Sequence, residues 1–171
     1  LTVAFDDDDV RTLSELEEGS VQYKFEKVGI EELLRRIIAN YRVEASAKKV
    51  ELTLKIHENA AGSSIHADRH KIEQAISNVV SNALRYSPDG GKVQIEVEKD
   101  GSDTVLSVED AGAGIAAEER EKVFERFYRT DRARNREKGG SGLGLSIARK
   151  IVKGHGGDIR AVDPRELGGA R

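Results

Sequence analysis

The sequence predicts an α+β fold, a two-layer α/β sandwich in which helices cover one face of a mixed sheet. Two observations support this prediction. Along the chain, the spacing of apolar residues changes repeatedly between a period of two and a period near 3.6, as it does in alternating strands and helices. The resulting order is strand, helix, two strands, helix, hairpin, loop, helix and strand, which suits three main helices packed on one side of a sheet.

The predicted strands are segments in which apolar and polar residues alternate, as they do when one face of a strand is buried. These segments are 21–28, 50–56, 64–67, 92–98, 104–109 and 158–162. Segments 92–98 and 104–109 are expected to form a hairpin around Asp100-Gly101, because Asp-Gly is a favoured turn pair.

The main predicted helices have the apolar spacing of an amphipathic helix. They are 30–47, 69–86 and 142–155, with shorter helices at 10–18 and 118–124. Asp68 is a preferred N-cap residue for the second helix, and Gly156-Gly157 ends the third. Segment 127–140 has no apolar periodicity, and we expect it to form a mobile loop.

Composition narrows the class of protein. A chain of 171 residues with 37% hydrophobic residues suits one compact domain. The absence of cysteine excludes disulfides and thiolate metal sites, and a net charge of −3 argues against nucleic-acid binding. No apolar run approaches the roughly 20 residues that span a bilayer, so we expect a cytoplasmic domain without membrane contact. The acidic run Asp6–Asp9 is interpreted as a solvated segment.

A line of polar residues follows the apolar face of the helix predicted at 69–86. Gln74, Asn78, Asn82 and Arg85 are spaced by four, four and three residues, so they share one side of the helix. Asn disfavours helix interiors, its amide oxygen suits Mg²⁺, and Arg85 could bind phosphate oxygens. From these residues alone, a solvated face and a binding site are equally good interpretations.

Two glycine-containing segments are candidates for ligand contact. Asp110 ends a predicted strand just before Gly112 and Gly114, so it could accept a hydrogen bond from an amine such as that of adenine, or form a turn. Segment 139–145 leads into a helix, whose exposed N–H groups attract anions such as phosphate. Its spacing matches neither a P-loop nor a dinucleotide-binding motif. The preceding segment 126–138, rich in Arg and Lys, is either a lid over a polyanion or a solvated loop.

In this order, four stretches resemble the ATP-binding domain shared by histidine kinases, type II topoisomerases, Hsp90 and MutL, the GHKL superfamily. The match is closest to the histidine kinases. The stretches are the N box at 68–88, the first glycine box at 108–115, the F box at 123–131 and the second glycine box at 139–157. The resemblance covers residues 20–171, and residues 1–19 are expected to end a preceding dimerisation and phosphoacceptor helix or to form a linker.

The resemblance implies a Bergerat ATP-binding fold that binds ATP and Mg²⁺ beneath a mobile lid. By matching position, the catalytic residues would be Asn78 and Arg129, with Arg129 at the terminal phosphate. Asn82 would hold the metal. The other nucleotide contacts would come from Arg85, Tyr86, Asp110, Gly112, Gly114, Gly140, Gly142, Leu143 and Gly144. Of these, Tyr86 would lie against the adenine and Asp110 would accept its amine.

The residue type at position 78 discriminates between ATP hydrolysis and phosphoryl transfer to a protein. The family's ATP hydrolases have a Glu there that activates water, and an amide cannot act as this base. The resemblance therefore implies a protein-histidine kinase domain that transfers the γ-phosphate of ATP to a histidine on a separate helical domain, which then phosphorylates a response regulator. His57, His66, His70 and His155 lie outside the family's phosphoacceptor context. The alternatives are a GHKL ATPase or clamp, a Ser/Thr kinase of the anti-sigma type, and a non-catalytic nucleotide-binding module.

The resemblance also carries expectations about the parent protein. Most members of the family are membrane-anchored sensors, and their dimerisation helices would lie outside the present domain, so the isolated domain is expected to be a monomer. The family continues into a closing strand where this sequence ends with 168–171. We therefore expect a frayed or truncated end.

Overall fold

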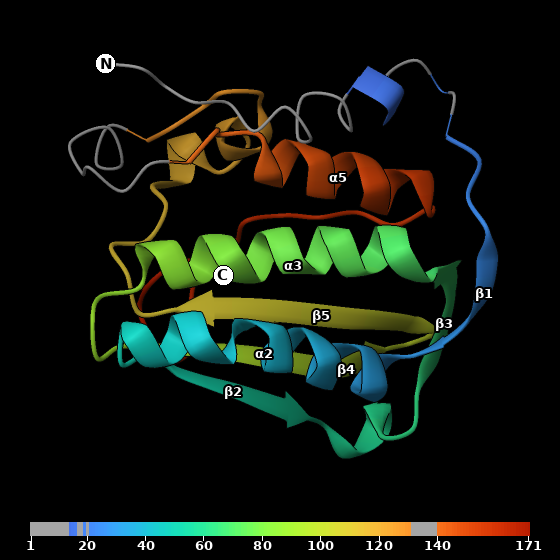
Figure 1. The fold of residues 1–171 in the computed structure, drawn as a ribbon, viewed down its shortest axis with the longest axis horizontal. Helices are drawn as coiled ribbons and strands as arrows, with labels where there is room; N and C mark the ends of the chain where they lie inside the picture. Colours follow the sequence, from blue (N-terminus) through green and yellow to red (C-terminus); the bar gives the residue numbers. More distant parts are fainter. Residues whose placement is uncertain (1–13, 17–18, 20, 131–139) are drawn as a thin grey trace.

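The computed structural model describes residues 14–16, 19, 21–130 and 140–171. Three helices lie side by side (Figure 1): α2 (Ile30–Ala47), α3 (Arg69–Tyr86) and α5 (Gly144–Gly154). α2 and α3 cover a sheet, and α5 packs beside α3. The sheet contains β2 (Glu51–Ile56), β4 (Lys92–Asp100) and β5 (Asp103–Asp110), in the order β2-β4-β5. β2 is parallel to β4 and β4 is antiparallel to β5. The predicted two-layer sandwich with a mixed sheet is confirmed.

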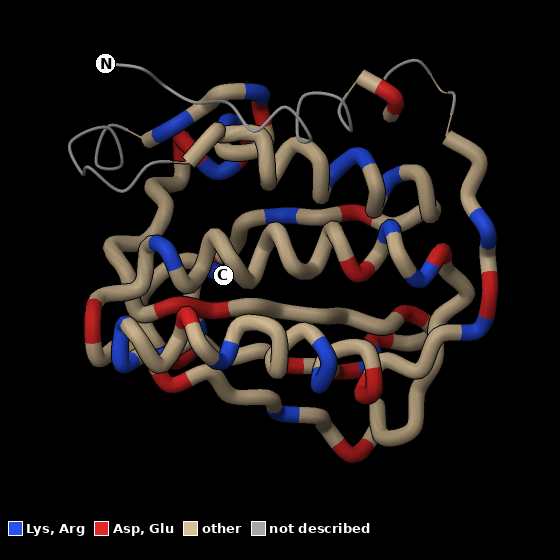
Figure 2. The backbone as a smooth tube through the Cα atoms, in the orientation of Figure 1, with Lys and Arg blue, Asp and Glu red and all other residues tan. Residues whose placement is uncertain are grey.

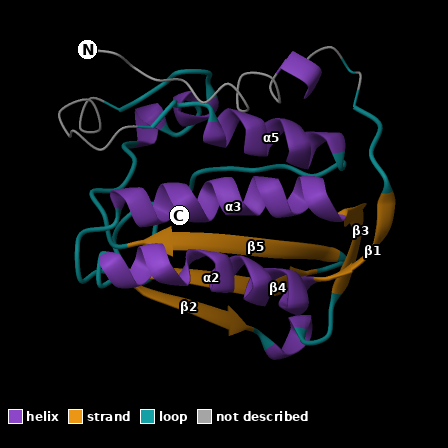
Figure 3. Ribbon diagram, in the orientation of Figure 1, coloured by secondary structure: helices purple, strands orange, loops and turns teal. Residues whose placement is uncertain are grey.

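Two further strands form a separate pair at the end of the sandwich where α3 begins (Figure 3). β1 (Phe25–Gly29) pairs antiparallel with β3 (Ser64–Asp68). β1 is shorter than the predicted strand 21–28, because residues 21–24 are not part of a strand. β3 leads directly into α3, so this pair fixes where the helix starts.

The bounds of α2 and α3 are those predicted from the sequence. The carboxylate of Asp68 caps α3, because its Oδ1 accepts a hydrogen bond from the backbone N–H of Lys71 at 3.1 Å. A short 3₁₀ turn, Glu58–Ala60 (η1), lies between β2 and β3.

The main core lies between the helices and β4. Val93, Ile95 and Val97 of β4 are fully buried and belong to the same cluster as Leu33 and Leu34 of α2. Because side chains alternate along a strand, the intervening polar residues of β4 lie on the outer face of the sheet. Gln94 and Glu96 on this face are nevertheless buried, which shows that another part of the chain covers them.

A second core cluster joins α5 to α3, and it contains Ala75, Leu143, Ile147, Ala148 and Ile151, with Leu16 packed against it. Side-chain hydrogen bonds hold α5 at both ends. At one end Asn78 Nδ2 donates to the carbonyl oxygen of Gly144 at 3.1 Å, and at the other the N–H of Asp68 donates to His155 Nε2 at 3.0 Å. The two helices therefore run antiparallel in a fixed register.

Several local expectations are wrong. Segment 118–124 forms two short 3₁₀ turns, η2 (Ala117–Glu119) and η3 (Lys122–Phe124), in place of one helix. α5 begins at Gly144, two residues later than predicted. Residues 158–162 form no strand. Most of the helix predicted at 10–18, and lid residues 131–139, lie outside the described residues.

The C-terminal segment is bonded to the sheet, which contradicts the expected frayed end. The N–H of Asp110 donates to the carbonyl oxygen of Ala170 at 2.9 Å, and the N–H of Val162 donates to the carbonyl oxygen of Arg171 at 2.8 Å. Arg171 also reaches the outer face of the sheet, where its guanidinium donates to Ser107 Oγ at 2.8 Å. Within the described part of the chain, no helix is long and apolar enough to cross a bilayer.

Candidate active site

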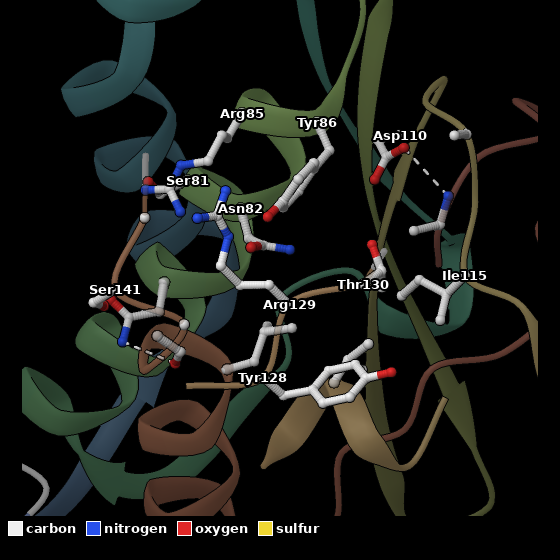
Figure 4. Close-up of a pocket in the computed structure, with 18 of the residues that line it drawn as sticks. Ser81, Asn82, Arg85, Tyr86, Asp110, Ile115, Tyr128, Arg129, Thr130 and Ser141 are labelled. Carbon is white, nitrogen blue, oxygen red and sulfur yellow. Dashed lines mark hydrogen bonds between the residues drawn. The ribbon is translucent and has the colours of Figure 1, made fainter. Parts of the chain in front are cut away.

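A cavity of about 210 Å³ opens between α3, the loop after β5 and the first residues of α5 (Figure 4). One wall comes from the C-terminal half of α3. Figure 2 shows that this half carries no charged residue before Arg85. The opposite wall comes from the end of β5, and the third comes from residues on both sides of segment 131–139.

One end of the cavity is cationic. Arg85 of α3 and Arg129 extend toward the same region, beside the amide of Asn82 (Figure 4). Gly140 lies directly against the Arg85 guanidinium, and a Cβ at Gly140 would overlap Arg85 Nη1. Two guanidinium groups beside a side-chain amide form a site for an anion rich in oxygen atoms, such as a polyphosphate.

Asn78 connects this end of the cavity to α5. Its Nδ2 donates to the carbonyl oxygen of Gly144, the first residue of the helix. A Cβ on Gly144 would lie 3.8 Å from Asn78 Cβ, in ordinary contact. The hydrogen bond from Asn78 holds the positive N-terminal end of α5 close to the polar line on α3, where that end favours a bound anion.

The other end of the cavity is acidic. Asp110 ends β5 with only 4% of its surface exposed, and its Oδ1 accepts hydrogen bonds from the N–H groups of Gly112 at 2.7 Å and Ala170 at 3.2 Å. Its other oxygen is turned toward the cavity, on the side of Tyr86 (Figure 4). Burial raises the pKa of Asp110, the two N–H groups counteract part of this rise, and the charge of Glu109 adds to it. The result is a fixed, desolvated acceptor.

Glycine is required at the positions near the cavity for different structural reasons. Gly112 lies against α3, because a Cβ there would be 2.6 Å from the carbonyl oxygen of Tyr86. Gly142 has a φ of +73° and adjoins Phe127, whose Cα would be 2.9 Å from an added Cβ. Phe127 itself has a positive φ of 59°, and its N–H donates to the carbonyl oxygen of Gly142 at 3.0 Å. This hydrogen bond joins the F box to the second glycine box.

The cavity brings together most of the site residues expected from the sequence. Those that line it are Asn78, Asn82, Arg85, Tyr86, Asp110, Gly114, Arg129, Gly140, Gly142 and Gly144. Two expected residues do not line it. The N–H of Gly112 donates a hydrogen bond to Asp110 Oδ1. Leu143 is fully buried in the core between α3 and α5.

Sequence reasoning missed part of the lining, namely Ser81, Ala113, Ile115, Val123, Tyr128, Thr130, Ser141, Leu145 and Ala170. Ser81 could have been found, because it lies three residues after Asn78 and four before Arg85 on one helix face. Ala170 carried no such signal, since it reaches the site only through backbone hydrogen bonds to Asp110.

Comparison with known proteins agrees with this geometry. A family model described as "Histidine kinase-, DNA gyrase B-, and HSP90-like ATPase" matches residues 67–171. The chain belongs to this family. Within it, the chain is an ATP-binding catalytic domain of the type found in sensor histidine kinases. The sensor histidine kinase WalK of Bacillus subtilis is 50% identical over 99 residues, which are 57% of this chain and 16% of WalK. The matched stretch thus spans about a sixth of the length of that relative.

Solved structures show the same fold. The mycobacterial sensor histidine kinase MprB matches this domain with a TM-score of 0.72 and 30% identity, over 86% of this chain and 92% of that chain. The histidine kinase ThkA, solved in complex with the response regulator protein TrrA, matches with a TM-score of 0.74 and 26% identity, over 94% of this chain and 44% of that chain.

Proposed function

We propose that this domain binds ATP together with Mg²⁺ and transfers the γ-phosphoryl group to a histidine on a separate helical domain of the same kinase. That histidine then phosphorylates a response regulator in the cytoplasm. The observation that carries the proposal is the polarity of the cavity, with Arg85, Arg129 and Asn82 at one end and Asp110 at the other. An adenine nucleotide has the complementary polarity, since its phosphates are anionic and its exocyclic amine donates hydrogen bonds.

The distribution of carboxylates favours phosphoryl transfer over ATP hydrolysis. Among the described residues that line the cavity, Asp110 is the only carboxylate, and it lies at the end away from the arginines (Figure 4). A water molecule near the terminal phosphate therefore has no neighbouring general base among these residues. The neutral imidazole of an incoming histidine needs no such base, because its nitrogen lone pair is already nucleophilic.

In the proposed step, the lone pair of the imidazole nitrogen forms a bond to the γ-phosphorus. The bond from this phosphorus to the oxygen bridging the β- and γ-phosphates breaks, and its electron pair leaves on ADP. Arg129 and Arg85 stabilise the charge on the phosphate oxygens. The amide oxygen of Asn82 is a suitable ligand for Mg²⁺, because this ion is commonly held by one or two protein oxygens, substrate phosphates and water. When bound, Mg²⁺ would neutralise phosphate charge.

Relatives support the proposed partners. WalK is a sensor histidine kinase, and ThkA was solved in complex with a response regulator protein. We propose that this domain acts in the same kind of phosphorelay, as a monomeric unit joined through residues 1–19 to the helices that carry the acceptor histidine.

The test combines the 171-residue chain, ATP labelled on its γ-phosphate, Mg²⁺ and a separately produced phosphoacceptor helix domain. We expect label on the acceptor that is lost in acid and kept in base, as a phosphoramidate bond requires. The control is the same acceptor with its histidine replaced. Label on the 171-residue chain alone, or rapid release of phosphate without an acceptor, would contradict the proposal.

A further inference from the structure

Two consecutive acidic residues end β5, and both contact the C-terminal segment. Successive side chains of a strand point to opposite faces, so Asp110 faces the cavity while Glu109 lies on the outer face of the sheet. Glu109 is nevertheless only 4% exposed. Its surroundings therefore come from the segment that covers this face, residues 165–171.

Three successive backbone N–H groups converge on the Glu109 carboxylate. The N–H of Arg165 donates to Oε2 at 3.2 Å, and the N–H groups of Glu166, at 2.8 Å, and of Leu167 donate to Oε1. Burial acts to raise the pKa of Glu109, but these three hydrogen bonds and the charge of Arg171 outweigh it, so the pKa lies below its ordinary value. The Glu109 side chain thus holds the segment mainly through the backbone N–H groups of residues 165–167.

The held segment continues to the edge of β5, where it contacts Asp110. Ala170 forms two backbone contacts with this residue, since its N–H donates to Oδ1 and its carbonyl oxygen accepts from the Asp110 N–H. Gly169 permits this approach, because a Cβ there would lie 2.6 Å from the Asp110 carbonyl carbon and closer still to its oxygens. Hydrogen bonds therefore join residues 165–170 to β5 at both ends, to Glu109 at one end and to Asp110 at the other.

We propose that Glu109 is a positioning residue that sets the purine selectivity of the nucleotide site. It holds residues 165–167, so that the N–H of Ala170 occupies Asp110 Oδ1 and the second oxygen stays fixed toward the cavity as an acceptor. Without Glu109, the Asp110 carboxylate loses one of its two N–H donors and can rotate. This inference rests on the proposed role of Asp110 in binding the adenine amine.

The outer face offers a matched control. Glu98 of β4 also binds the C-terminal segment, but only through side chains, since its Oε1 accepts from Arg165 Nη2 at 3.1 Å. Glu98→Gln removes a charge from the same face and the same partner residue. It leaves the backbone N–H groups of 165–167 in their contacts with Glu109.

The experiment measures the dissociation constants of ADP and GDP for the wild type, Glu109→Ala, Glu109→Gln and Glu98→Gln, well below each melting temperature. We expect Glu109→Ala to lower the preference for ADP over GDP by about tenfold, the loss that follows when one charge-assisted hydrogen bond no longer orients the acceptor. Glu109→Gln keeps one accepting oxygen and should retain an intermediate preference. Glu98→Gln should match the wild type.

A second readout follows the amide of Ala170 directly. In Glu109→Ala its hydrogen exchange should become faster, because its acceptor loosens, whereas in Glu98→Gln the exchange rate should not change. A lower melting temperature with an unchanged ADP-to-GDP ratio would overturn the inference, because Glu109 would then stabilise the fold without orienting Asp110.

Asp110→Asn separates this inference from the function on which it rests. If Asp110→Asn alters the ADP-to-GDP ratio and Glu109→Ala does not, the positioning role is wrong and the role of Asp110 stands. If neither variant alters the ratio, the assignment of Asp110 to the adenine amine is wrong as well.

Discussion

The two ends of the cavity are built in different ways. At the cationic end, the long side chains of Arg85 and Arg129 converge from two segments far apart in the sequence. At the acidic end, Asp110 is buried and backbone N–H groups hold it in one orientation. Charges on long side chains attract any nucleotide polyphosphate, while a fixed acceptor discriminates between bases. We therefore expect changes at the first end to alter rate and overall affinity, and changes at the second to alter selectivity.

The largest effect is expected from Arg129→Ala. If Arg129 contacts the terminal phosphate, its loss should slow phosphoryl transfer to the acceptor domain by about 10³-fold, the lower range for removal of a catalytic arginine. ADP affinity should change little, because ADP lacks the γ-phosphate. Single-turnover transfer and ADP titration measure the two quantities. Arg35→Ala removes an exposed arginine paired with Glu31 and serves as control. An equal loss of ADP affinity would show that Arg129 binds the nucleotide uniformly.

Asn82→Ala tests the metal at the same end. In Mg²⁺ its ATP affinity should fall by about 100-fold, or about 2.8 kcal/mol, to the value measured for the wild type in EDTA. Titrations with and without EDTA provide the comparison. Asn59→Ala removes an exposed asparagine that binds the backbone of Lys99, and it should keep the full Mg²⁺ dependence. If Asn82→Ala keeps that dependence too, Asn82 is not a metal ligand.

Asp110→Asn is expected to act on selectivity. The two N–H groups that now bind Oδ1 would hold the oxygen of the new amide, so its NH₂ group would face the cavity. A donor would then face the adenine amine, and ADP affinity should fall by about tenfold, while the oxygen of guanine should be better accepted. Titration with ADP and GDP measures the change. Asp158→Asn, at an exposed ion pair with Arg160, should leave the ratio unaltered; a wild type without preference for ADP would contradict the assignment.

The smallest effect concerns pH. The pKa of Asp110 is raised above the ordinary 3.8, so ionised Asp110 destabilises the fold at higher pH, and protonation relieves this as pH falls through the raised pKa. Binding of an amine donor favours the carboxylate, so ADP affinity should be complete above this pKa and fall by about twofold where pH equals it. Titrations from neutral to acidic pH measure the decline, which should be absent in Asp110→Asn.

Glu109 should behave in the opposite sense. Its pKa is depressed below 4.5, so its stabilising contacts are complete above that pH and are lost only as pH falls through the lower value. If ADP affinity began to decline only at the depressed pKa of Glu109, the pH dependence would be assigned to Glu109 and not to Asp110.

Local sequence features predicted the helices well. α2 and α3 have their predicted bounds, because each combines a continuous apolar stripe with a clear end, such as the Asp68 cap. The polar line from Asn78 to Arg85 lies on one wall of the cavity, since helical spacing alone places these residues on one side.

What the sequence could not predict depends on contacts between distant residues. The C-terminal segment was expected to be frayed or truncated, yet Glu109 and Asp110 bind it across separations of 56 to 60 residues. Leu143 was expected among the nucleotide contacts from the family resemblance, yet its side chain is fully buried in the core between α3 and α5. Segment 118–124 was expected to form one short helix, but its only apolar residues are the adjacent Val123 and Phe124, and both are buried in a 3₁₀ turn.

The hydrogen bond between Phe127 and Gly142 has a consequence for how this domain type can diversify. It joins the chain before segment 131–139 to the chain after it, so insertions or deletions within that segment need not break this contact. In general, each doubling of the length of a loop costs only about 0.6 kcal/mol in loop closure. We therefore expect variants of this domain with a longer or shorter segment 131–139 to keep the contact between Phe127 and Gly142.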